Sequence, residues 1–86
     1  MEHYKVMYAA LCEYAEDNGY SIERIRFTEK ELYTVITPTK RDIIPTDLLS
    51  LAMESIEGRN GAGCFVRNDI ETAKPQLCVY WQEMKP

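Results

Sequence analysis

Eighty-six residues are enough for one folded domain and too few for two, because domains usually hold about 100 to 150 residues. A chain of this length has little room for a deep, water-excluding cavity, which weighs against complex catalysis. The 14 acidic and 10 basic residues give a net charge of -4. Because this charge repels polyanions, a basic protein suits the chain better as a partner than nucleic acid does.

The sequence carries neither of the usual signals for a membrane or for secretion. No run approaches the roughly 18 to 20 apolar residues that span a bilayer. The first residues include acids where a signal peptide carries cations, and they form no continuous apolar segment. We therefore expect a cytoplasmic protein with no membrane partner.

The first half of the chain predicts a helix followed by a β-hairpin. Apolar residues recur every three or four positions over residues 2–17, the period of one helical face, and Gly19 is a good stop signal. β-branched and aromatic residues then predict strands at 20–27 and 32–37, joined by a short polar connection. The alternation slips within the first strand, which indicates either a bulge near residues 23–24 or a later start of that strand.

The second half repeats the pattern of a helix and two strands. An extended connection carries the adjacent cations Lys40 and Arg41, and a proline then opens a helix at 45–57 with a buried stripe of leucine, alanine, methionine and isoleucine. Glycine follows this helix as a stop. Strands are predicted at 63–67 and 77–84, and the last has apolar residues on both faces, which favours a central position in the sheet.

These elements predict an α+β fold, a single two-layer domain that spans residues 1–86 in the order αββαββ. We expect a four-stranded, mainly antiparallel sheet built from two hairpins, with both helices packed on one face. The two αββ units share this pattern and no evident sequence identity. An open sheet of four strands leaves two edges, and either edge offers a route to a homodimer by strand addition.

The glycine-rich loop 58–63 is the feature most suggestive of ligand binding. Glycines let backbone N–H groups converge on an anion, and Arg59 beside Asn60 would add charge. The spacing fits neither a P-loop nor a dinucleotide fingerprint, because here the helix comes before the loop and a strand follows it. We therefore interpret the loop mainly as a helix stop and turn.

The three cysteines lie within apolar periodic segments and lack the close pairs that structural zinc sites use. The chain has one histidine, near its N-terminus, so a cysteine nucleophile has no evident base. We predict no catalytic residues, no metal site and no cofactor. The protein is expected not to be an enzyme; the opposing hypothesis, catalysis by Cys64 or Cys78, requires a thiol that reacts rapidly at neutral pH.

Aromatic residues exceed what a core of this size needs, with six tyrosines and one tryptophan. Tyrosine and tryptophan concentrate binding energy at protein interfaces, which makes Tyr33, Tyr80 and Trp81 candidate contact residues. Aromatic and cationic side chains together can also stack single-stranded bases. The combinations that could do so are Arg24 and Arg26 with Phe27, and Arg67 with Trp81.

Acidic charge, abundant tyrosine, small size and the missing catalytic sets favour a small protein-interaction module. We expect it to inhibit or regulate a larger protein by covering part of that protein's surface. The alternative is binding of an anion, a nucleotide or nucleic acid through the loop 58–63 and nearby cations. The candidate interaction residues are Lys40, Arg41, Arg59, Asn60, Tyr33, Tyr80 and Trp81.

Overall fold

Two helices and four strands follow one another as two helix–strand–strand units. A computed structural model describes the protein over residues 3–28, 30–58 and 61–82. In chain order the elements are α1 (His3–Asp17), β1 (Tyr20–Phe27), β2 (Glu31–Pro38), α2 (Thr46–Ser55), β3 (Gly63–Asn68) and β4 (Pro75–Gln82). The predicted order αββαββ is confirmed, and the last two residues of the strand predicted at 77–84 lie outside the described residues.

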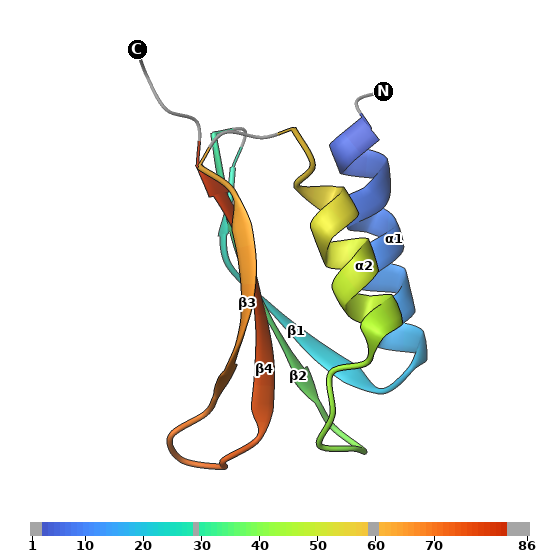
Figure 1. Ribbon diagram of the computed structural model, residues 1–86, viewed down its shortest axis with the longest axis vertical. Helices are drawn as coiled ribbons and strands as arrows, with labels where there is room; N and C mark the ends of the chain where they lie inside the picture. Colours follow the sequence, from blue (N-terminus) through green and yellow to red (C-terminus); the bar gives the residue numbers. More distant parts are fainter. Residues whose placement is uncertain (1–2, 29, 59–60, 83–86) are drawn as a thin grey trace.

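The strands form one sheet in the order β1-β2-β4-β3, and all three neighbouring pairs are antiparallel. Each αββ unit therefore contributes one central strand and one edge strand. The predicted central position of the last strand is confirmed, because β4 lies between β2 and β3. Both helices cover the same face of this sheet and leave its other face open (Figure 1).

The core lies between the helices and the covered face of the sheet. Its fully buried members come from the periodic apolar positions of both layers: Leu11, Ala15, Leu48 and Ala52 from the helices, and Ile36, Leu77 and Val79 from the strands. Gly58 follows α2 with a φ of 77°, the left-handed conformation that closes a helix at low cost for glycine. Neither helix in the described part of the chain has the length and apolar character needed to cross a membrane.

The alternation of β1 is interrupted, as its sequence predicts, although at a different residue. The register with β2 shifts between Arg24 and Arg26, so the irregularity falls at Ile25 instead of near residues 23–24. The extra residue brings Ile22 and Phe27 to the same face of the sheet despite their odd separation, because Phe27 now pairs with Leu32. This places the Phe27 ring on the helix side.

Candidate functional site

The open face of the sheet carries a group of apolar side chains, the open-face patch, from three neighbouring strands. Its members are Tyr33 and Val35 of β2, Cys78 and Tyr80 of β4, and Phe65 of β3. Tyr33 pairs with Tyr80, and both Val35 and Phe65 pair with Cys78. Directly paired residues of an antiparallel sheet point to the same side. The strand register therefore gathers residues from positions 33 to 80 into one surface.

Within the patch, small residues are buried and the rings around them are exposed. Val35 and Cys78 expose 2% and 0% of their surface, although neither described helix covers this face. Phe65 and Tyr80 remain 44% and 39% exposed, and their rings meet edge to face at a centroid distance of 6.1 Å. The rings thus shield the small residues and still present apolar surface to solvent.

Gly63 makes room for the Tyr80 ring. These residues pair across β3 and β4, and a Cβ atom built on Gly63 would lie only 2.6 Å from the Tyr80 hydroxyl oxygen. Any larger residue at position 63 would displace the ring. The last glycine of the loop 58–63 is therefore explained by the open-face patch.

Two arginines flank the patch. Arg67 of β3 donates from Nε to the Gln76 side-chain oxygen at 3.1 Å and from Nη1 to the Tyr33 hydroxyl at 3.5 Å. Arg26 of β1 lies 3.7 Å from a carboxylate oxygen of Glu31. Both of these hydrogen-bond partners are neutral, and the Arg67 charge also acts on the Asp69 carboxyl, whose pKa is lowered first by hydrogen bonding from Thr72 and further by Arg67.

The exposed acids of the helices lie on the other layer of the molecule. They are Glu13, Glu16 and Asp17 on α1, and Asp47 and Glu54 on α2. On the open side, Glu31 lies beside Arg26, Glu23 lies on the same face, and the Asp69 carboxylate acts on Arg67. Each arginine that flanks the open-face patch therefore has an acid nearby.

The thiols are poorly suited to nucleophilic chemistry. All three cysteines are free, and burial raises the pKa of both the Cys64 and the Cys78 thiols. A raised pKa reduces the fraction of thiolate, which is the reactive form. Within the described residues, no three His, Cys, Asp or Glu side chains come together as a group that could hold a metal ion.

The structure brings together only some of the residues that the sequence singles out. Tyr33 and Tyr80 share the open-face patch, whereas Trp81 is 4% exposed and belongs to the core on the helix side. Arg67 accordingly lies on the face opposite to Trp81. The connection that holds Lys40 and Arg41 precedes α2 and the glycine-rich loop follows it, so these segments lie at opposite ends of the helix (Figure 1). Arg59 and Asn60 lie outside the described residues.

The sequence interpretation did not select Phe65, and it paired Arg67 with a different ring. The signal that identifies both is parity within β3: Phe65 and Arg67 alternate with Cys64 and Val66, which point to the helix side. That signal becomes useful only when the register between β3 and β4 is known, because the register decides which parity joins Tyr80.

Comparisons with protein-family models, with characterised proteins and with solved structures found no match to this chain. Its function is therefore inferred from its own geometry.

Proposed function

We propose that this chain is a small protein-interaction module that binds another protein through the open-face patch. The observation that carries the proposal is the exposure of the Phe65 and Tyr80 rings above small residues that are already buried. Association with a partner would bury these rings further without removing any side chain from the core. Aromatic residues and arginine are enriched where protein interfaces concentrate their binding energy.

The patch indicates the chemistry of the partner surface. Its centre is apolar and aromatic, so it fits an apolar segment of the partner, and Arg67 at its border fits a carboxylate beside that segment. We infer that the module regulates or inhibits a larger cytoplasmic protein by covering such a surface. The basic partner expected from the net charge would bind a different surface, the acidic layer of helices, and is a separate prediction.

We extend the proposal to a second surface, the edge of the sheet at β3. A second copy of the chain would add one of its own strands to the sheet at this edge. The edge strand β1 has an irregular register at Ile25 and three exposed charged residues against one, Arg67, on β3. Both the irregular register and the charges discourage strand addition. By contrast, β3 pairs without interruption from Gly63 to Asn68, and its Val66 side chain is 48% exposed. The β3 edge is therefore the route for the predicted homodimer.

Anion, nucleotide or nucleic-acid binding through the loop 58–63 stays a prediction. It requires Arg59, which lies outside the described residues, and its expected signature is binding that weakens steeply with salt and disappears in Arg59→Ala. Rings beside arginines can stack bases. On the open face, however, each flanking arginine has an acid nearby, so nothing there favours a polyanion over a protein.

Variants of the patch test the proposal. Phe65→Ser combined with Tyr80→Ser removes both exposed rings, and Ile43→Ser combined with Met53→Ser removes side chains that are 50% and 61% exposed elsewhere. In affinity capture from nuclease-treated host lysate, we expect the wild type and the control to retain the same protein, and the patch variant to lose it. Equal retention by both variants, or capture that nuclease abolishes, would overturn the proposal.

A further inference from the structure

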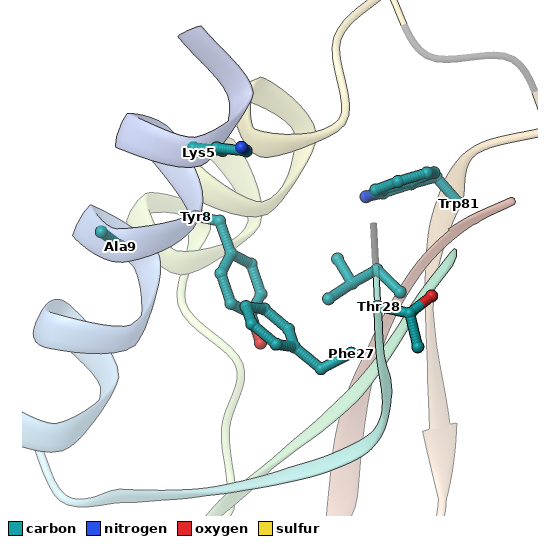
Figure 2. A pocket seen from close by; sticks show the side chains of 7 residues that line it. Lys5, Tyr8, Ala9, Phe27, Thr28 and Trp81 are labelled. Atoms are coloured by element: carbon teal, nitrogen blue, oxygen red, sulfur yellow. The ribbon is translucent and has the colours of Figure 1, made fainter. Parts of the chain in front are cut away.

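A hollow lies on the helix side of the sheet, between α1 and one end of the strands. This hollow, which we call the α1 hollow, has a volume of about 490 Å³. Its lining residues are Lys5, Tyr8, Ala9, Phe27, Thr28, Leu32 and Trp81 (Figure 2). Sites for small molecules usually measure about 300 to 1,000 Å³ and are mostly apolar. The α1 hollow meets both conditions.

Phe27 leaves apolar surface uncovered at the hollow. It pairs with the buried Leu32 and so points toward the helix layer, yet its side chain is 61% exposed. On the helix side its ring is in contact with Tyr8, with centroids 5.4 Å apart and planes inclined by 31°. An apolar ligand in the hollow would cover the Phe27 ring, and removing that area from water favours binding.

The described lining of the hollow carries a positive charge, although the chain as a whole is acidic. Lys5 is the only charged residue among the described residues that line it. Figure 2 shows the Lys5 side chain extending from α1 toward the side of the hollow where Trp81 lies. An ammonium group at the border of an apolar hollow is complementary to an anionic head group on an apolar tail.

A neighbouring hollow shows which way such a ligand would lie. It shares Tyr8 and Phe27 with the α1 hollow, and its charged lining residues are Glu13 and Glu16 of α1 and Arg24 of β1. Two carboxylates against one guanidinium leave this hollow with an acidic excess, whereas Lys5 attracts an anionic head group. The head group would therefore lie at the Lys5 end, with the tail against Tyr8 and Phe27.

We propose that the α1 hollow binds an alkyl carboxylate of medium chain length. The carboxylate pairs with Lys5, and the alkyl chain packs against the rings and Leu32. This site lies on the opposite side of the sheet from the open-face patch, so the two surfaces can be occupied at the same time.

The test uses Trp81, the only tryptophan in the chain and part of the hollow wall, as a fluorescence reporter. The full chain is titrated below micelle-forming concentrations with decanoate, decanol and decyltrimethylammonium. We expect saturable one-to-one binding, with decanoate about threefold to fivefold tighter than decanol, as suits a partly exposed ion pair. The cationic amphiphile should bind most weakly.

Variants assign the binding to this hollow. Lys5→Met should remove the preference for decanoate over decanol while retaining decanol binding, and the matched control Lys40→Met should keep the preference. Ala9→Phe, which adds a ring to the wall, should weaken all three probes. Absence of saturable binding, equal affinity for the three head groups, or an unchanged preference in Lys5→Met would overturn the proposal.

Discussion

The hydroxyl oxygens of Tyr8 and Thr34 lie 2.7 Å apart in the interior and form a hydrogen bond that joins α1 to β2. Both residues are buried, with 8% and 0% of their surface exposed. The bond satisfies the one polar side chain that β2 points toward the helices between Leu32 and Ile36. It also fixes the Tyr8 ring against Phe27 at the α1 hollow.

A double-mutant cycle measures this bond. Thr34→Val should lower the free energy of unfolding by about 1 to 3 kcal/mol, because it leaves the Tyr8 hydroxyl without this partner. Tyr8→Phe should cost a similar amount for the same reason. Combining the two should cost clearly less than their sum, since no buried hydroxyl of the pair remains. Strictly additive losses in urea denaturation would show that the two hydroxyls do not interact.

Gly63 and Gly58 should respond to alanine for different reasons. Gly63→Ala places a methyl group against the Tyr80 hydroxyl, so it should displace that ring and lose an aromatic pair worth about 0.5 to 1.5 kcal/mol. Gly58→Ala meets no atom within 4 Å, but its φ of 77° should cost about 1 to 2 kcal/mol.

Proton NMR shifts of Tyr80 separate the two effects. They should move in Gly63→Ala and stay in place in Gly58→Ala. If Gly63→Ala leaves the Tyr80 and Phe65 shifts unchanged, Gly63 is not what makes room for the Tyr80 ring.

The Cys64 and Cys78 thiols should react slowly with a disulfide reagent at pH 7 in the folded protein, because burial raises the pKa of each. Of single-cysteine variants, the one retaining the fully buried Cys78 should react more slowly than the one retaining the half-buried Cys64. Denaturation should abolish the difference. Rapid labelling of either folded thiol would instead favour the catalytic hypothesis.

The same two pKa values predict how stability depends on pH. A thiol whose pKa is higher in the folded state stabilises the fold below its unfolded pKa of about 8.5, and this contribution is lost as the pH rises through the folded pKa. The free energy of unfolding should therefore fall as the pH rises above about 8.5. Replacing Cys64 and Cys78 together by alanine should make the free energy of unfolding fall less steeply with pH. An unchanged pH dependence would show that these two thiols do not cause the fall.

Self-association through β3 should depend on Val66 and not on the opposite edge. In analytical ultracentrifugation we expect the wild type to dimerise with rising concentration and Val66→Lys to stay monomeric, because a charge on an edge strand opposes strand addition. Ile25→Lys alters a residue of similar exposure on β1 and should dimerise normally. A wild type that is monomeric throughout would refute the β3 interface.

Local sequence patterns were sufficient to predict the fold, because periods of 3.6 and 2 residues are visible without knowing what a segment packs against. The same local patterns did not predict the position of the irregularity in β1. A bulge near residues 23–24 or at Ile25 equally reconciles Ile22 with Phe27, and only pairing with β2 selects between them. The helices and strands therefore follow from neighbouring residues, whereas the register follows from packing.

The candidate surfaces were harder to predict because each joins distant segments. Alternation puts Leu77, Val79 and Trp81 on one side of the last strand, but alternation alone does not say that this side faces the helices. Phe65 joins Tyr80 only through the register of β3 with β4. Likewise, Lys5 and Phe27 meet at the α1 hollow only when α1 packs on the sheet.

Photo-crosslinking from position 65 tests the open-face patch most directly. A benzophenone side chain replaces Phe65 in one variant and Phe27, which is 61% exposed on the helix side, in a matched control. On irradiation in host cells we predict one discrete adduct with another protein from position 65. This adduct should be absent from position 27 and lost when Tyr80→Ser is added. Adducts with nucleic acid alone, or no protein partner other than a second copy of the chain, would contradict the proposed function.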